Sequence, residues 1–218
     1  MTLGYVFDLD ETLVTYDPGR PGIFEAACTR MGVDPIEAAQ EAIGPGYVET
    51  FKTFEESPYI GAARAAREAG LEIDPRTFAD YYIEAELAAS NVPDGTEALL
   101  SELSPVGVVT NGYGPVQRRK LAAMGLDEHV DTLVCADDVK GFKPDDAPFD
   151  AVTSALDASE YVMIGDSVEY DIRPANERGY RTVLVGDEVA DVAGTDPDSI
   201  PDIEISDPSE LATLSGRL

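Results

Sequence analysis

The segment LGYVFDLDET, residues 3–12, decides the fold because an apolar run ends abruptly in carboxylates. Residues 3–8 are apolar on both faces of an extended chain, which is typical of a buried parallel strand. Asp8 and Asp10 are two residues apart at the end of this run and therefore point to the same side. Two carboxylates placed in this way can address one substrate atom, so that one attacks while the other handles protons.

Further β-rich runs resemble the first one, and helical patterns lie between them. The predicted strands cover residues 106–110, 132–136, 161–166 and 182–185, with a weaker one at an edge over 202–205. The predicted helices cover residues 96–103, 115–124, 148–156 and 170–178. Strands that alternate with helices predict right-handed crossovers and an α/β fold with a doubly wound parallel sheet.

Residues 14–92 interrupt this alternation, because they contain no convincing strand. Their helical patterns cover residues 22–31, 35–43, 46–56, 58–69 and 75–90. We therefore predict two domains. Residues 1–13 and 93–218 form the α/β core, and residues 14–92 form a helical unit inserted after the first strand.

Polar side chains follow the predicted strands at their carboxyl ends, where a doubly wound sheet binds its ligands. Like charges at short range cannot all ionise cheaply, and a hard divalent cation removes this difficulty. Magnesium prefers oxygen ligands, among them a few carboxylates. A lysine suits an anionic group on the substrate, and a hydroxyl and backbone N–H groups can donate to phosphate. The residues concerned are Asp8, Asp10, Thr110, Asn111, Gly112, Lys143, Asp166 and Asp171.

This set resembles the haloacid dehalogenase superfamily in four motifs, which occur in the family's order and span nearly all of the core. The motifs are DLDET at 8–12, VTNG at 109–112, KPD at 143–145 and GDS at 165–167, followed by Asp171. The resemblance implies a Rossmann-like core with an inserted helical cap. It also implies a hydrolase that uses Mg²⁺ and acts on a small phosphorylated metabolite.

The resemblance further implies a role for each matching residue. Asp8 would be the nucleophile that takes the phosphoryl group and forms an aspartyl-phosphate. Asp10 would protonate the leaving alcohol and then activate the hydrolytic water. Thr110, Asn111 and Lys143 would bind the phosphate oxygens.

The same resemblance assigns the metal ligands. Magnesium would be held by Asp8, the backbone carbonyl of Asp10, and Asp166, while Asp171 would either ligate through water or orient the others. Many relatives have Asn before the final Asp, whereas this chain has Tyr170. This departure puts the detailed role of Asp171 in doubt, and leaves the expectation of a metal unchanged.

Several functions share these core residues. A phosphosugar mutase would keep all of them, and the cap would decide between mutase and phosphatase. A 2-haloacid dehalogenase attacks carbon and needs neither Asp10 nor Asp166, which argues against that activity. A non-catalytic binding protein would be expected to lose at least one of these side chains. Within the cap, Arg20 and Tyr47 of the 44–47 loop either select the substrate or are a surface arginine and part of an interhelical linker.

The charge of the chain restricts its partners, because 43 acidic residues face 15 basic ones, a formal net charge of −28. Such a chain repels nucleic acid and anionic membranes. We interpret the acidity as a solvated surface suited to a salty, halophilic cytoplasm. The Asp-rich stretch 187–207 is the best candidate for an alternative calcium site, but it lacks the usual loop pattern. Neither a membrane span nor a signal peptide is expected, and both a monomer and a homodimer stay open.

Overall fold

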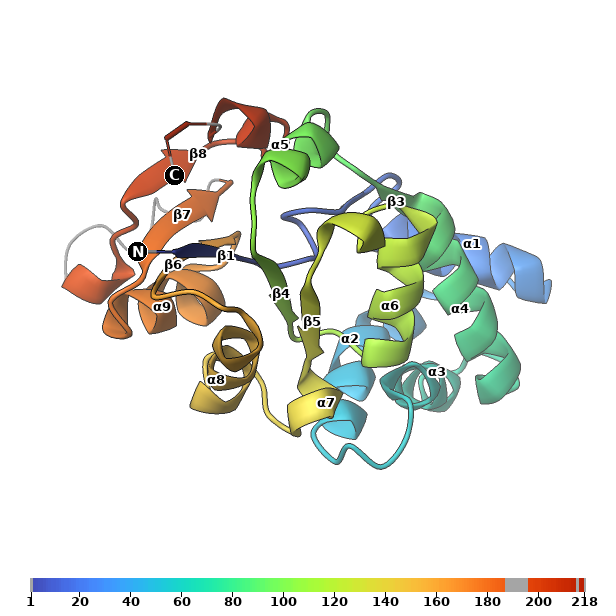
Figure 1. Cartoon of the computed structure of the whole chain (residues 1–218). Helices are drawn as coiled ribbons and strands as arrows, with labels where there is room; N and C mark the ends of the chain where they lie inside the picture. The colour runs from blue at the N-terminus through green and yellow to red at the C-terminus, as the bar shows by residue number, and fades with distance from the viewer. Residues whose placement is uncertain (1, 187–195, 215, 218) are drawn as a thin grey trace. The chain divides into compact units, whose positions relative to one another are not determined.

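A parallel sheet forms the centre of the larger part of the chain, as the sequence predicts. The computed structural model describes residues 2–186, 196–214 and 216–217, and within them the sheet has six strands in the order β5-β4-β1-β6-β7-β8 (Figure 1). All neighbouring strands run parallel. The strands are β1 Leu3–Phe7, β4 Val106–Thr110, β5 Thr132–Cys135, β6 Glu160–Gly165, β7 Arg181–Val185 and β8 Ile203–Ile205. The predicted strands, including the weak one at the edge, are therefore confirmed.

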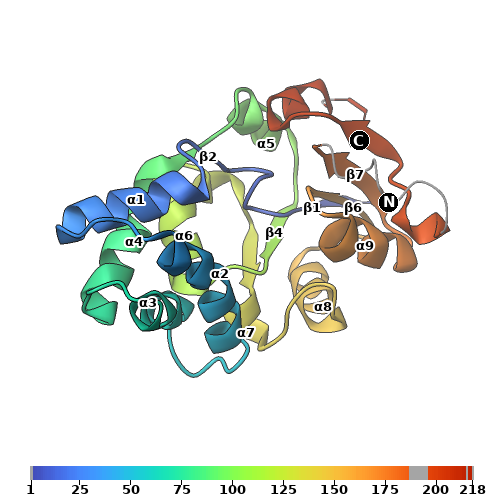
Figure 2. The same cartoon turned by 180° about the vertical axis from the view of Figure 1, so that it is seen from behind.

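Helices cover both faces of the sheet. Side chains of consecutive strand residues point to opposite faces, so each strand packs against both layers of helices. One face packs on α5 Thr96–Glu102, α6 Gly114–Ala123 and the 3₁₀ helix Pro208–Leu214. The other face packs on α8 Asp146–Ala155 and α9 Arg173–Glu177, which lie beside each other (Figure 2). In β1, Phe7 faces the first layer and Val6 the second. Burial on both faces explains why these strands are apolar throughout.

The order of the strands places several loops at one edge of the sheet. From β1 the chain passes outward to β4 and β5, and then returns to β6, β7 and β8 on the other side. The carboxyl ends of β1, β4 and β6 are therefore adjacent, at the position where such sheets bind ligands. The helix predicted at 170–178 begins differently from expectation. A π-helix, Val168–Ile172, precedes α9 and turns the chain directly behind β6.

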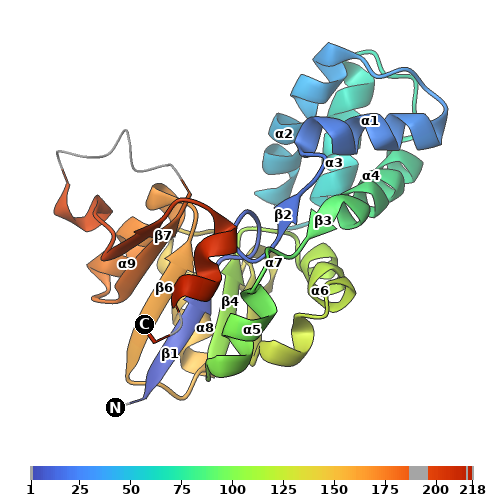
Figure 3. The same cartoon turned by 90° about the horizontal axis from the view of Figure 1, so that it is seen from above.

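Residues 16–90, all of which are described, form a separate compact unit of four α-helices (Figure 3). They are α1 Arg20–Met31, α2 Glu37–Phe51, α3 Pro58–Glu68 and α4 Pro75–Ala89. The other compact unit comprises Met1–Thr15 and Asn91–Leu218. The expectation that this region lacks strands is wrong at its two ends. There, β2 Thr15–Tyr16 pairs with β3 Ser90–Asn91 where the chain leaves and re-enters the core.

The predicted linker at 44–47 is also wrong, because α2 continues through it as one helix with Pro45 inside. The cause lies in the packing of α2 on α3. A Cβ atom at Gly46 would lie 2.5 Å from the Cβ of Ala65, and one at Gly61 would lie 2.9 Å from the carbonyl oxygen of Gly46. The two glycines let the helix backbones approach closely, and this contact offsets the cost of about 3 kcal/mol for a proline within a helix.

Two expectations concern the remaining parts of the chain. Among the residues that the structure describes, no helix is long and apolar enough to cross a bilayer. The alternative calcium site at 187–207 falls partly outside the described residues, since 187–195 are not among them.

Candidate active site

Asp8 follows β1 directly, and the turn after it is held by its own backbone. The N–H of Asp8 donates to the carbonyl of Ile164 at 2.9 Å, which continues the pairing of β1 with β6. The N–H groups of Leu13 and Val14 both donate to the carbonyl of Leu9, at 3.0 and 2.9 Å. Buried apolar side chains anchor this turn, so Asp8 is left facing the edge of the sheet with 7% of its surface exposed.

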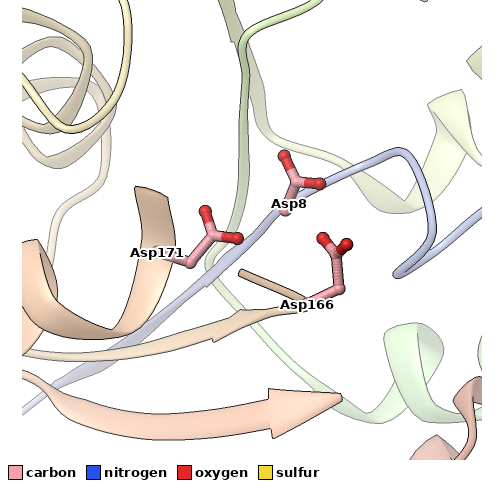
Figure 4. A group of neighbouring side chains, drawn as sticks. All are labelled: Asp8, Asp166 and Asp171. Atoms are coloured by element: carbon pink, nitrogen blue, oxygen red, sulfur yellow. The ribbon is translucent and has the colours of Figure 1, made fainter. Parts of the chain in front are cut away.

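Asp8, Asp166 and Asp171 bring their carboxylates together, as Figure 4 shows. Asp166 follows β6, and Asp171 lies in the π-helix behind it. One oxygen from each carboxylate lies within 4.8 Å of the other two, and among the described residues this is the group found suitable for a metal ion. Gly165 makes room for it, because a Cβ atom there would lie 2.4 Å from Oδ2 of Asp171.

Lys143 is the cation of this cluster. Its Nζ atom lies 2.5 Å from Oδ1 of Asp8 and 2.6 Å from Oδ1 of Asp171. The lysine exposes 3% of its surface and Asp171 only 1%. Tyr170, by contrast, exposes 42%. The tyrosine that departs from the family pattern is thus largely exposed, while Asp171 is buried against the lysine.

Burial and neighbouring charges shift the pKa values of this cluster. Burial, followed by the charge of Asp171, raises the pKa of Asp166 to about 7. Burial also raises the pKa of Asp8 well above its ordinary value, although Lys143 opposes the shift. Burial alone would lower the pKa of Lys143, but the carboxylates of Asp171 and Asp8 outweigh it and hold that pKa above its ordinary value. One lysine does not balance three carboxylates, of which two are buried and one is half-buried, so a bound divalent cation fits this set of oxygen ligands.

The Thr110-Asn111-Gly112 motif supplies a hydroxyl and fixes Lys143. The Oγ1 atom of Thr110 accepts from the N–H of Gly112 and from Nε2 of Gln117, both at 3.0 Å. The proton of the hydroxyl is then directed to a further acceptor, as a phosphate donor requires. The Asn111 side chain donates to the carbonyl of Lys143 at 3.0 Å and accepts from its N–H at 2.6 Å. The amide of Asn111 therefore positions the lysine, and its backbone N–H is the group suited to phosphate.

Asp10 turns its side chain toward α6 and is not part of the three-carboxylate group. Its Oδ2 accepts from Nε2 of Gln117 at 2.6 Å, and its Oδ1 accepts from Nζ of Lys120 at 2.5 Å. This orientation agrees with a side chain that handles protons. Under the sequence prediction, only the backbone carbonyl of Asp10 reaches the metal.

Gln117 and Lys120 are the residues near the site that the sequence analysis missed. They expose 2% and 0% of their surfaces and lie on the buried side of α6 beside Val116 and Leu121. A helix that buries polar residues within its apolar stripe departs from the ordinary amphipathic pattern. That departure, just after the Thr110 motif, was the available signal.

The two candidate substrate-selecting residues belong to the helical unit. The Arg20 side chain is 54% exposed, and its Nη1 lies 3.7 Å from the buried carboxylate of Glu86. Its guanidinium carbon lies 4.9 Å from the centre of the Tyr16 ring. Tyr47 packs edge-on against Tyr59, with ring centres 5.2 Å apart. Arg20 thus has a defined position, whereas Tyr47 belongs to the aromatic packing of the unit.

The fold and this site define a class of protein. Residues 5–192 match the family model described as haloacid dehalogenase-like hydrolase, and the chain belongs to this family of enzymes. The chain is 32% identical over 215 residues to the ribulose-1,5-bisphosphate 5-phosphatase of Halopiger xanaduensis, with 84% of each chain covered. It is 31% identical over 190 residues to the phosphoglycolate phosphatase of Cereibacter sphaeroides, which covers 83% of this chain and 84% of the relative.

A solved structure agrees with this assignment. The 2-haloacid dehalogenase of Pseudomonas syringae pv. Tomato superposes with a TM-score of 0.69 at 26% identity, and covers 100% of this chain and 99% of its own. Phosphatases and a dehalogenase are therefore both among the proteins that this chain resembles.

Proposed function

We propose that the chain is a magnesium-dependent phosphatase that hydrolyses a small organic phosphomonoester through a phosphorylated Asp8. The observation that carries the proposal is the placement of Lys143 between Asp8 and Asp171, with Asp166 beside them. Oxygen ligands and a fixed cation together suit a phosphoryl group better than they suit a neutral carbon centre.

In the first step, an oxygen of Asp8 forms a bond to phosphorus while the bond from phosphorus to the leaving oxygen breaks. Asp10 gives its proton to that oxygen, which departs as an alcohol. Lys143, the hydroxyl of Thr110 and the backbone N–H of Asn111 hold the three remaining phosphate oxygens.

In the second step, Asp10 takes a proton from a water molecule whose oxygen attacks phosphorus. The bond between phosphorus and Asp8 breaks, so inorganic phosphate leaves and Asp8 regains its carboxylate. The two steps return every group to its starting state, which a catalytic cycle requires. Asp10 acts first as an acid and then as a base.

Asp8, Asp166 and the backbone carbonyl of Asp10 would hold Mg²⁺, and Asp171 would orient Lys143 and complete the cluster. The ion, when bound, offsets the charge of the carboxylates and of the phosphoryl group. Support for it comes from the three converging carboxylates and the raised pKa of Asp166.

Two other activities of the family deserve comparison with this proposal. A dehalogenase would need neither the Asp10 carboxylate that Gln117 and Lys120 hold, nor Asp166 with its raised pKa. A phosphosugar mutase would use the same core residues. It would differ in passing the phosphoryl group to a second hydroxyl without net release of phosphate.

We also propose that residues 14–92 act as a cap and that Arg20 contributes to substrate selection, assisted by Tyr47. An exposed guanidinium held by Glu86 and Tyr16 suits a second anionic group on the substrate. Ribulose bisphosphate and phosphoglycolate, the substrates named for two relatives, both carry such a group. The substrate class would then be a phosphate ester with a second phosphate or a carboxylate.

The test is release of phosphate by the purified protein at molar salt, with Mg²⁺ and with EDTA. The panel contains p-nitrophenyl phosphate, ribulose 1,5-bisphosphate, phosphoglycolate and a nucleoside monophosphate. Wild type should release phosphate only with Mg²⁺, and Asp8→Asn should be inactive. Equal activity of Asp8→Asn would refute the nucleophile, and turnover unaffected by EDTA would refute the metal. Phosphate transfer that needs a bisphosphorylated sugar, without net release, would identify a mutase.

A further inference from the structure

Two side chains of α6 hold one carboxylate from opposite ends. Nε2 of Gln117 lies 2.6 Å from Oδ2 of Asp10, and Nζ of Lys120 lies 2.5 Å from its Oδ1. Gln117 and Lys120 are three residues apart in the same helix and therefore share one face. Each oxygen of the carboxylate has its own donor, so the plane of the group is fixed as well as its position.

The stability of the fold does not account for this arrangement. The Lys120 side chain exposes none of its surface and that of Asp10 exposes 23%. An ion pair with a fully buried member stabilises a protein little compared with apolar residues of the same size. Val116 and Leu121, which expose 2% and 3%, already supply the apolar packing of α6. A charged side chain at position 120 is better explained by its partner, Asp10.

The pair is also joined to the phosphate-binding motif. Nε2 of Gln117 lies 3.0 Å from Oγ1 of Thr110, so one amide spans Thr110 and Asp10. The fit depends on Gly112, because a Cβ atom there would lie 1.9 Å from that same Nε2. The glycine of the motif therefore makes room for the glutamine.

We propose that Lys120 and Gln117 are positioning residues that fix the Asp10 carboxylate for its two proton transfers. The inference rests on the proposed function, in which Asp10 protonates the leaving oxygen and then deprotonates water. A carboxylate has about four acceptor sites, so each of these two donors occupies only one of them and holds the group without itself taking the place of the proton in transfer. A displacement of the acid by about 1 Å can cost roughly 10²-fold in rate.

The test compares leaving groups. An alkoxide needs a proton as it departs, whereas p-nitrophenolate does not, and kcat/KM reports the steps up to the phosphorylation of Asp8. For Lys120→Met and Gln117→Met, we expect kcat/KM to fall about 10- to 100-fold with the best alkyl phosphate of the panel. The loss with p-nitrophenyl phosphate should be about tenfold smaller. Arg119→Met removes the same charge from an exposed position of α6 and should keep the wild-type ratio.

A double-mutant cycle with Asp10→Asn gives a second readout. It can also be measured with p-nitrophenyl phosphate, as the change in kcat. Residues that act through Asp10 should cause no further loss once Asp10 is replaced. If both leaving groups suffer equally, or if the losses multiply in the double variants, Lys120 and Gln117 are structural and the proposal is overturned. If Lys120→Met does not fold, Gln117→Met still tests the proposal, because it removes no charge. A wild type that releases no phosphate at all would instead refute the proposed function.

Discussion

Asp171 and Lys143 form a buried ion pair in which Nζ lies 2.6 Å from Oδ1, and their side chains expose 1% and 3% of their surfaces. Lys143 also contacts Asp8, so the lysine lies between the two carboxylates. The pair comes from a loop and a π-helix that are 28 residues apart in the chain.

Replacing Asp171 by Asn should therefore impair catalysis more than folding. The amide keeps the shape of the side chain, and Asp8 still balances the lysine, but Lys143 loses one of its two charged partners. We expect kcat to fall roughly 10²-fold, as a small displacement of a reacting group would cause. Glu169→Gln removes a charge from an exposed position of the same turn and should keep wild-type kcat. Equal kcat for Asp171→Asn and wild type would contradict the role.

Gly165→Ala should weaken the proposed metal site without replacing any of its proposed ligands. The added Cβ would lie 2.4 Å from Oδ2 and 2.5 Å from Cγ of Asp171, so the buried carboxylate would have to move. We expect Mg²⁺ affinity, measured by calorimetry, to fall at least about tenfold. Gly141→Ala is the control, because its Cβ would meet no atom closer than 3.4 Å. Unchanged affinity in Gly165→Ala would show that Asp171 does not contribute to Mg²⁺ binding.

The pKa of about 7 for Asp166 predicts how metal-free stability depends on pH. The folded state keeps a proton on Asp166 up to about pH 7, whereas the unfolded chain releases it near the ordinary pKa of 3.8. Folding thus takes up a proton in this window, and the free energy of unfolding should fall as pH rises through it. The raised pKa of Asp8 acts in the same direction.

Binding of Mg²⁺ requires the ionised carboxylates and should reverse this trend. The increase in melting temperature caused by Mg²⁺ should grow from pH 5 to about pH 7 and then level off. Asp166→Asn should flatten the profile of the metal-free protein, since its amide does not titrate. Thermal unfolding in EDTA and in Mg²⁺ at several pH values measures both effects. A metal-free profile shared by wild type and Asp166→Asn would rule out Asp166 as its source.

The sheet could be predicted because each strand is apolar on both faces and ends in turn-forming or polar residues. The continuous helix α2 could not, since Gly44-Pro45-Gly46 is locally a helix-breaking sequence. Its helical state depends on α3, whose Gly61 comes close to Gly46, and a tertiary contact of this kind leaves no periodic signal in the sequence.

In the candidate site, too, some residues could be predicted from the sequence and others could not. Asp8, Thr110 and Asp166 lie at or directly after the ends of predicted strands, so their convergence follows from the topology. Gln117 and Lys120 reach Asp10 across 107 and 110 residues of chain. Within their own helix they interrupt the apolar stripe of Val116 and Leu121, but the sequence does not show which residue they contact, and only the tertiary structure shows that it is Asp10.

The contact between α2 and α3 gives a prediction about stability. A Cβ atom at Gly61 would lie 1.8 Å from Oγ1 of Thr50 and 2.9 Å from the carbonyl oxygen of Gly46, so Gly61→Ala must push the helices apart. We expect a loss of about 1–3 kcal/mol in the free energy of unfolding. Gly44→Ala, also in α2 but with no atom within 4 Å of the added Cβ, should gain up to about 1 kcal/mol. Denaturant titration checks both, and a stable Gly61→Ala would contradict the close packing.

The net charge of −28 predicts that salt stabilises the folded protein. Repulsion acts over about 30 Å at 0.01 M salt but only about 3 Å at 1 M. The melting temperature should therefore rise between 0.05 and 2 M KCl.

Exposed Glu49, Glu55 and Glu68 line one cavity of about 560 Å³ in the helical unit. Changing all three to Gln should raise the melting temperature at low salt and reduce its dependence on KCl. Replacing KCl by sucrose separates screening from general exclusion of cosolutes, because sucrose should stabilise wild type and the triple variant equally. An identical KCl dependence in both proteins would show that the repulsion does not arise at this cavity.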